Sequence, residues 1–278
     1  MDARPRSFYL LSAFFILFLL FLYGPTLTIG ILSFQGPKGG LTFPMNGVSL
    51  HWFADLFKQQ AVGDIWGSFR RSFVLGLMVM ASTVFVSVSA GLAFRKTFKG
   101  SGVLFYMAIT SLVIPSILVS LGVGLIFSQL GFKVHWATSG FGSQLTWTLP
   151  FGLLIIFAVF NRFDKSFEEA ARDQGATPWQ TIRFVILPII APSLIGVALF
   201  GFTLSYDEFA RTLLTAGSYN TLPLEIFGIT TNVTTPVIYA LGTLTTLFSL
   251  LIIGAFLVIV WAMGKRRTAR GSDAGTAL

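Results

Sequence analysis

The residues of this chain that could carry out chemistry are few and widely separated. Its two histidines, His51 and His135, lie far apart and it has no cysteine, so no metal-binding spacing is present. Gly264-Lys265 lacks the upstream glycine of a phosphate-binding loop and is followed by Arg266. The sequence therefore predicts no catalytic residue, no metal site and no cofactor bound by the chain itself.

One pair of adjacent carboxylates, Asp207 and Glu208, follows the end of a long apolar run. We place this pair on the outer face of a membrane protein, where it would create a local negative field that attracts a cation. The alternative is that the two acids only hydrate the start of a loop, and the sequence leaves both interpretations open.

Segment 161–188 is polar, lies between two apolar runs and carries helix signals. Ser166 and Glu169 have the spacing of a capping box, and Gly175 is the residue type that commonly ends a helix. The predicted helix has an apolar stripe of Phe163, Phe167, Ala170 and Ala171 and a polar side of Glu168, Glu169, Arg172 and Asp173. Spacing alone leaves open whether this helix lies on lipid or docks into a partner.

A second capping box, from Thr177 to Gln180, follows in the same segment. Pro178 stands at the first helical position, where its missing N–H costs nothing. Pro188 is expected to end or kink the helix that begins here. Segment 161–188 is therefore predicted to contain two short helices joined by a turn.

The composition indicates a membrane protein. Hydrophobic residues make up 54% of the 278 residues and charged residues only 11%, which is more apolar than an ordinary soluble domain. A membrane-spanning helix needs about 20 mostly apolar residues. Six runs without Lys, Arg, Asp or Glu qualify: 8–33, 72–94, 102–127, 145–160, 189–206 and 237–263. We predict an all-α polytopic membrane protein with six transmembrane helices.

The distribution of Lys and Arg predicts the orientation of these helices. Cations are denser on the face that carries both termini, so both termini are predicted to be cytoplasmic, although Arg70 and Arg71 do not fit this pattern. Membrane topology accounts for the excess of cations behind the net charge of +8. No aromatic platform accompanies these cations, so no nucleic-acid partner is expected. Residues 1–264 are predicted to form one transmembrane domain, and 265–278 a disordered basic cytoplasmic tail against the lipid.

Small residues recur every fourth position in the third predicted span, at Ser116, Ser120, Gly124 and Ser128. Residues four apart share a helix face, and small ones let helices approach closely. The stripe therefore indicates either tight helix packing, which the same spacing in the second span also favours, or the lining of a passage. Pro115, directly before the stripe, permits a kink.

The first predicted outer loop, 34–71, contains an apolar cluster of Trp52, Phe53, Leu56 and Phe57. We expect a short helix here whose apolar side chains lie in the membrane interface. A docking surface is the alternative interpretation.

The motif Glu169-Ala170-Ala171, followed by Gly175 and then by Leu187-Pro188, resembles the EAA signature of the membrane-spanning permease subunits of ABC importers. Segments 202–209, 221–224 and 41–53 are similar to the spermidine/putrescine branch of that family, so the resemblance covers nearly the whole chain outside the tail. Ser116 departs from this branch, which often has an acid directly after the proline of the third span.

The resemblance implies a type I importer fold in the bacterial inner membrane. The implied partners are a second permease subunit, two cytoplasmic ATP-binding subunits that hold ATP and Mg²⁺, and an extracytoplasmic solute-binding protein. Segment 161–188 is then the ATPase-coupling element, with Phe167, Glu169, Ala170, Ala171, Arg172 and Gly175 as its residues. The expected substrate is a polyamine or a related small solute, and the expected pathway residues are Asp207, Glu208, Ser116, Ser120 and Gly124.

Two other classes of protein are weighed against this one. An ion-coupled secondary transporter or a channel is the main alternative, but the predicted spans hold no ionisable residue that could form an intramembrane ion site. An intramembrane enzyme lacks paired catalytic residues. Energy for transport is therefore expected to enter from outside the bilayer, through the coupling segment.

Overall fold

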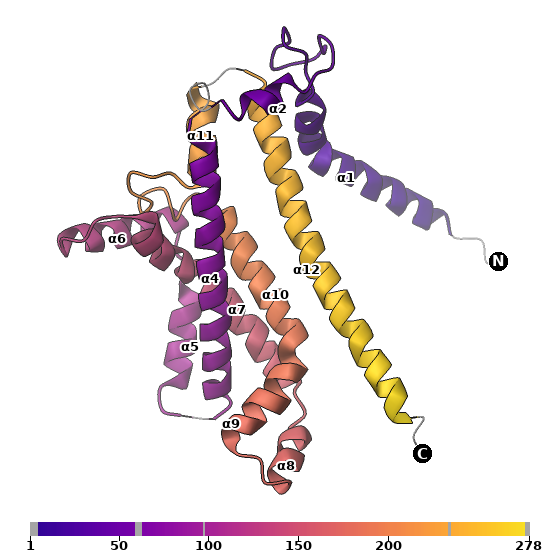
Figure 1. Cartoon of the computed structure of the whole chain (residues 1–278), viewed down its shortest axis with the longest axis vertical. Helices are drawn as coiled ribbons and strands as arrows, with labels where there is room; N and C mark the ends of the chain where they lie inside the picture. Colours follow the sequence, from indigo (N-terminus) through magenta and orange to yellow (C-terminus); the bar gives the residue numbers. More distant parts are fainter. Residues whose placement is uncertain (1–4, 59–62, 97, 233–234, 276–278) are drawn as a thin grey trace. The chain divides into compact units, whose positions relative to one another are not determined.

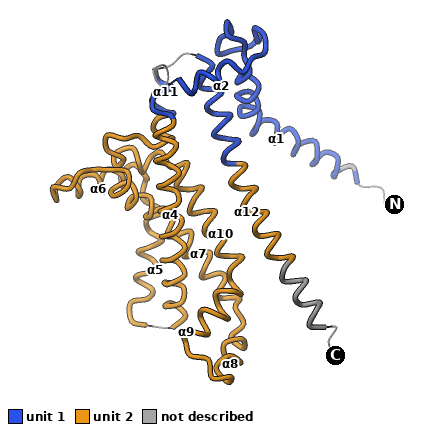
Figure 2. The backbone as a smooth tube through the Cα atoms, viewed as in Figure 1, with its two compact units in different colours: residues 1–65, 226–249 blue, residues 66–225, 250–278 orange. Residues whose placement is uncertain are grey.

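The computed structural model describes the backbone of residues 5–58, 63–96, 98–232 and 235–275, and it is almost entirely helical (Figure 1). Its helices in chain order are α1 (Arg6–Leu32), α2 (His51–Asp55), α4 (Ile65–Phe94), α5 (Ser101–Thr110), α6 (Ser116–Gln129), η1 (Trp136–Gly140), α7 (Phe141–Asn161), α8 (Ser166–Asp173), α9 (Pro178–Thr181), η2 (Ile182–Ile186), α10 (Leu187–Tyr206), α11 (Leu222–Asn232) and α12 (Val237–Gly275). The chain divides into two compact units, residues 1–65 with 226–249 and residues 66–225 with 250–278 (Figure 2). The prediction of one domain over 1–264 stays a prediction.

Five helical stretches of the described chain are long and apolar enough to cross a membrane: Ser7–Leu32, Ile65–Phe94, Trp136–Asn161, Pro178–Tyr206 and Val237–Lys265. They coincide with five of the six predicted spans. The remaining span, predicted over 102–127, is divided into α5 and α6, each shorter than a bilayer crossing. The count of six spans and the cytoplasmic placement of both termini stay predictions.

Pro115 explains the division of the third predicted span. Its ring cannot donate a backbone hydrogen bond and disfavours helical backbone in the residue before it, so α5 ends and α6 begins afresh at Ser116. Figure 1 shows α6 leaving the end of α5 at a steep angle. The kink permitted by the sequence is thus a full break between two helices.

In the larger unit, α5, α6 and α10 pack against α7. Glycines also set how closely α4 approaches α7: a Cβ added to Gly152 would lie 2.3 Å from the Oγ of Ser87, and one added to Gly91 would lie 2.3 Å from a methyl of Ile156. The small residues that recur every fourth position in the second predicted span are Thr83, Ser87 and Gly91. Their predicted packing role is confirmed, since they form the surface of α4 that contacts α7.

In the smaller unit, α2 contributes to an apolar core. Trp52 and Leu56 are buried there with Ile229, Val237, Ala240 and Leu241. The prediction that this cluster faces lipid is wrong for Trp52 and Leu56, because residues four apart share one helix face and that face is covered within the unit. Phe57 is exposed, as predicted.

The last helix, α12, begins at Val237, where the sixth span was predicted. It continues into the predicted tail and ends at Gly275, since no proline interrupts its hydrogen-bond ladder after the apolar run. Residues 276–278 lie outside the described residues. The domain boundary at residue 264 and the attraction of the tail to lipid stay predictions.

Candidate functional site

The helix α8 ends as its sequence predicts. Gly175 has a φ of +82°, the left-handed conformation, directly after the helix. The N–H of Ala176 donates to the carbonyl oxygen of Ala171 at 3.0 Å, and the N–H of Gly175 donates to that of Arg172 at 2.8 Å. These two bonds form a Schellman motif, which satisfies carbonyl groups that the helix end leaves without partners.

The start of α8 differs from the predicted capping box. The N-cap is Lys165, and neither Ser166 nor Glu169 caps the helix. Instead the Oδ1 atom of Asp164 accepts the N–H of Ser166 at 2.9 Å. This hydrogen bond lowers the pKa of the Asp164 carboxyl, because it favours the charged form. The prediction failed because Asp164, two residues before Ser166, competes for the same orphan N–H group.

The two faces of α8 are divided differently from the predicted apolar and polar sides. Phe167 is 52% exposed, and Glu169 and Ala170 are exposed beside it. Glu168, which the sequence places on the solvent side, is only 8% exposed and points into the protein. The helix therefore presents a mixed apolar and acidic face outwards and holds one carboxylate inside.

Glu168 anchors α8 to the end of α4. Its carboxylate forms an ion pair and a hydrogen bond with the guanidinium of Arg95, and Arg172 lies 3.8 Å from its second oxygen. The Arg95 guanidinium also lies 5.0 Å from the ring centroid of Phe160 and 5.3 Å from that of Phe163. Charge-assisted hydrogen bonds are stronger than neutral ones, and aromatic faces attract cations, so this contact fixes the position of α8 on the larger unit.

The second short helix follows the prediction more closely. The Oγ1 of Thr177 accepts the N–H of Gln180, and the Gln180 side chain accepts the N–H of Thr177 at 2.8 Å, so this capping box is confirmed. Pro188 does not end the helix. The wide π-helical turn η2 directly precedes α10, and such a turn accommodates the proline within the continuing helix.

Replacing Gly175 by valine is expected to destabilise the turn after α8 by about 1–2 kcal/mol, because a Cβ in the left-handed conformation clashes with its own backbone. No neighbouring atom lies within 4 Å of that added Cβ, so the cost comes from the backbone alone. Hydrogen exchange of the α8 amides should be faster in Gly175→Val. Gly175→Asn is the matched control, since Asn tolerates this conformation. Equal exchange in both variants and the parent would show that the turn does not hold α8.

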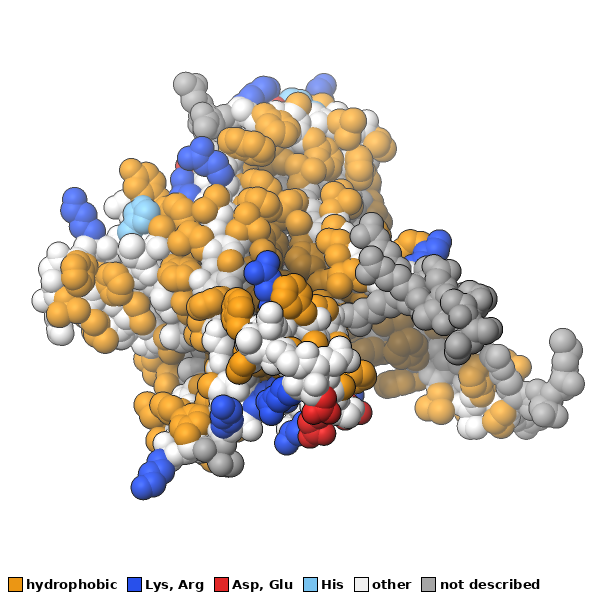
Figure 3. All heavy atoms as spheres, turned by 60° about the horizontal axis from the view of Figure 1, so that its bottom comes forward, with side chains coloured by type: hydrophobic (Ala, Val, Ile, Leu, Met, Phe, Trp, Pro, Cys, Tyr) orange, Lys and Arg blue, Asp and Glu red, His pale blue; other side chains and the backbone are white. Residues whose placement is uncertain are grey.

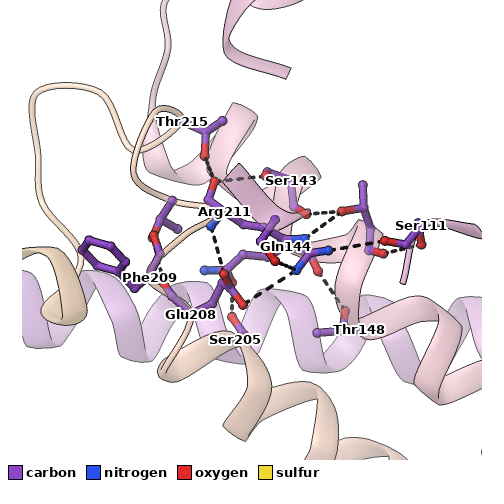
Figure 4. A network of polar contacts seen from close by, with 12 residues as sticks. Ser111, Ser143, Gln144, Thr148, Ser205, Glu208, Phe209, Arg211 and Thr215 are labelled. Atoms are coloured by element: carbon purple, nitrogen blue, oxygen red, sulfur yellow. Dashed lines mark hydrogen bonds and ion pairs between the residues drawn. The ribbon is translucent and has the colours of Figure 1, made fainter. Parts of the chain in front are cut away.

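A buried polar network surrounds Arg211, whose side chain is 0% exposed (Figure 4). Its guanidinium donates to the Oγ of Ser116 at 2.8 Å and to the Oγ1 of Thr146 at 3.2 Å, and it lies 4.6 Å from the ring centroid of Trp147. The network joins the α5–α6 break, α7 and the chain after α10. The sequence analysis did not identify this network. The position of Arg211 three residues after Glu208 is the signal that could have indicated it.

The predicted acidic pair is separated in the structure. Glu208 accepts the backbone N–H of Arg211 at 2.9 Å and its Oε2 lies 3.9 Å from the Nη1 atom of that residue, so the two charges offset each other. Asp207 has solvent-accessible surface, but the protein atoms around its carboxyl displace part of the water there, and this desolvation raises its pKa above the ordinary value. Of the two predicted acids, Asp207 is thus the one whose charge is presented outwards.

The small residues of α6 face the chain segment that follows α10. Ser120 is fully buried and its Oγ accepts the N–H of Leu214 at 3.0 Å, while a Cβ on Gly124 would lie 2.8 Å from the Leu214 carbonyl oxygen. Ser116 binds Arg211. The structure therefore brings Ser116, Ser120 and Gly124 together in close packing, which was one of the two alternatives for this stripe.

Arg71, which did not fit the charge pattern, has a structural contact. Its Nε donates to the carbonyl oxygen of Asn220 at 2.7 Å, and its guanidinium lies 5.7 Å from the ring centroid of Tyr219. One residue on, the Oγ of Ser72 accepts the N–H of Leu222 at 2.8 Å. The start of α4 thus holds the loop that leads into α11.

Residues 83–265 match the family model described as the binding-protein-dependent transport system inner membrane component. The spermidine/putrescine transport system permease protein PotC of Haemophilus influenzae is 28% identical over 251 residues, which cover 88% of this chain and 94% of that protein. The putrescine transport system permease protein PotI of Escherichia coli is 29% identical over 231 residues, 81% of each chain.

Two solved structures have a similar fold. A bacterial ABC transporter involved in the import of the acidic polysaccharide alginate gives a TM-score of 0.67 at 15% identity and covers 93% of this chain and 98% of the matched chain. The MetNI methionine ABC transporter, in an inward-facing conformation, gives a TM-score of 0.54 at 20% identity and covers 72% and 94%. At these identities the similarity concerns the fold alone.

Proposed function

Because the chain belongs to the family of binding-protein-dependent transport system inner membrane components, we propose that it forms half of the translocation pathway of a polyamine importer. The chain is a multi-pass permease subunit of the bacterial inner membrane and is not itself an enzyme, as the EAA signature predicted. In the proposed complex it pairs with a second permease subunit. Two ATP-binding subunits hold ATP and Mg²⁺, and a solute-binding protein delivers the substrate from outside.

The observation that supports energy coupling through this chain is the construction of α8. Phe167, Glu169 and Ala170 form an exposed face, while Glu168 ties the opposite face to Arg95 and a Schellman motif closes the helix. A helix of eight residues has little stability by itself. These contacts hold it in place, so that it can transmit movement of the ATP-binding subunit to the spans. We assign Phe167, Glu169, Ala170, Ala171, Arg172 and Gly175 to the contact with the ATP-binding subunit and to its geometry.

The proposed substrate is a polyamine such as putrescine or spermidine, since the two relatives described above carry those names. The carboxylate of Asp207 supports a cationic substrate. It follows the end of α10, whereas α8 precedes the start of that helix, so Asp207 lies at the end of the span where the substrate is proposed to arrive and its negative charge would attract a cation. Glu208 contributes less, since Arg211 offsets its charge. Ser116, Ser120 and Gly124 are buried or packed in this conformation, so their part in the pathway depends on movement of α6.

Uptake of radiolabelled putrescine and spermidine tests the proposal. Cells that lack this chain should lose uptake of one of the two compounds and regain it on complementation, and an ATP-binding subunit should co-purify with the chain in mild detergent. An ion-coupled carrier would instead transport without such a subunit and would respond to collapse of the ion gradient. Co-purification without any effect on polyamine uptake would support the importer function but contradict polyamine as the substrate.

Asp207→Asn is expected to lower polyamine uptake about fivefold, if its charge contributes about 1 kcal/mol to attracting a cation at the surface. The loss should shrink at high salt, because exposed charges are screened over about 8 Å at physiological ionic strength. Initial uptake rates at several salt concentrations provide the measurement. Equal rates for the parent and Asp207→Asn at low salt would show that the Asp207 charge does not attract the substrate.

A further inference from the structure

A cavity of about 500 Å³ lies between the end of α4, α8 and the α9–η2 segment. Basic side chains dominate its polar lining: Arg95, Lys96, Lys165 and Arg172, with Glu168 as the acidic lining residue. Figure 3 shows Lys and Arg side chains gathered beside a smaller group of acidic ones at the end of the molecule that comes forward in that view. The cavity therefore carries a net positive charge.

Some of the charged residues around the cavity form ion pairs with each other, and others do not. Glu168 is paired with Arg95 and with Arg172, so its carboxylate is already used. Among the ion pairs formed by the described residues, none involves Lys96 or Lys165, and both residues are exposed. Two cations are thus available to bind an anion.

The position of the cavity relative to the predicted spans indicates the chemical class of the anion. The apolar stretch Ile65–Phe94 ends directly before Arg95, and the stretch Pro178–Tyr206 begins at a residue that lines the cavity. Both apolar stretches therefore end beside the cavity, and the end of an apolar span is where phospholipid headgroups are expected. Leu92, Ile182 and Ile186 give it apolar walls as well.

A second cavity, of about 430 Å³, shares Arg95 and Lys165 with the first. Its walls include the aromatic rings of Phe94, Phe105, Phe157 and Phe160. A ligand that carries an anionic group at Lys165 and an apolar chain would find a partner for each part. A small hydrophilic anion would leave the aromatic walls without a partner.

We propose that an anionic glycerophospholipid binds here, with its phosphate between Lys96 and Lys165 and the start of an acyl chain along the phenylalanines. The bound lipid would pack behind α8 and support the helix from the membrane side. This site is separate from the outward face of α8 and its test does not depend on transport or on the identity of the substrate.

Native mass spectrometry of the full chain in non-ionic detergent, titrated with dioleoyl phosphatidylglycerol, measures the first lipid-binding step. The double variant Lys96→Gln with Lys165→Gln should weaken that step about 25-fold, since each cation near an anionic headgroup contributes roughly a factor of five. Lys99→Gln with Lys133→Gln removes the same charge at exposed positions outside the cavity and should bind within about twofold of the parent. Dioleoyl phosphatidylcholine should bind no better than phosphatidylglycerol binds to the first double variant.

Two further arms distinguish a lipid in the cavity from a free phosphate and from lipid bound elsewhere on the surface. Ala93→Trp fills the cavity without a change in charge and should also weaken binding, whereas unchanged binding would show that the lipid does not enter it. Glycerol 3-phosphate has the phosphate without the chains and should compete only weakly; competition as strong as that of the lipid would show a free-phosphate site and overturn the proposal. If both double variants lost affinity for phosphatidylglycerol equally, with unchanged unfolding temperatures, the binding would be a non-specific attraction between charges and the proposal would be wrong.

Discussion

Arg211→Met is expected to lower the free energy of unfolding by about 3–5 kcal/mol, the cost of removing one member of a buried ion pair. The substitution keeps much of the side-chain volume but leaves Glu208 with a partly buried charge and removes the donors to Ser116 and Thr146. Denaturant unfolding in detergent, followed by near-ultraviolet circular dichroism, measures the change.

Two further variants identify the origin of the loss. Arg70→Met removes an exposed arginine from α4 and should change the free energy of unfolding by less than about 0.5 kcal/mol. Adding Glu208→Gln to Arg211→Met should recover part of the stability, because the unpaired charge is then absent. If Arg211→Met is as stable as Arg70→Met, the network around Arg211 does not contribute to the fold.

The local features of this fold follow from the sequence because each depends on neighbouring residues. The left-handed turn at Gly175 and the capping box at Thr177 are set within a few residues, and five spans are set by runs of apolar residues. Pro115 indicated that the helix could be interrupted before Ser116, but it did not predict a complete break. Proline permits either a kink or a break, and the packing partners of the two halves decide between them.

Long-range pairs could not be predicted in the same way. Arg95 and Glu168 are 73 positions apart, and Arg211 and Ser116 are 95 apart, so only the folded chain brings them together. A single sequence gives the charge of each residue but not its burial. For that reason Glu168 was placed on a polar face and Arg211 was not identified as a functional residue, although both are buried.

Glu168→Gln is expected to accelerate hydrogen exchange of the α8 amides by about 10- to 150-fold, since a hydrogen bond between charged groups contributes about 1.5–3 kcal/mol. Both partners are mostly buried, at 18% and 11% side-chain exposure, so solvent screens the pair little. Substrate uptake should fall by a factor of ten or more, because the loosened helix no longer transmits movement to α4. Exchange mass spectrometry and uptake assays measure the two effects.

Glu169→Gln is the matched control on the next residue. Glu169 is exposed and does not cap the helix, so exchange of α8 should stay as in the parent while uptake falls through loss of the proposed ATPase contact. A double-mutant cycle of Arg95→Gln and Glu168→Gln should show coupling of about 0.5–3 kcal/mol. Normal exchange in Glu168→Gln would mean that the ion pair with Arg95 is dispensable for holding α8.

The most direct test of the account is a cross-link from the exposed face of α8. The chain has no cysteine, so a single cysteine at Ala170 gives one defined attachment point for a short photoactivatable reagent. The account predicts that Ala170→Cys in native membranes cross-links to a protein with a Gly-x-x-x-x-Gly-Lys-Ser/Thr nucleotide-binding loop, identified by mass spectrometry, and that Leu130→Cys, exposed at the end of α6, does not. Products confined to lipid, or the same products from both positions, would contradict the claim that α8 is the contact with an ATP-binding subunit.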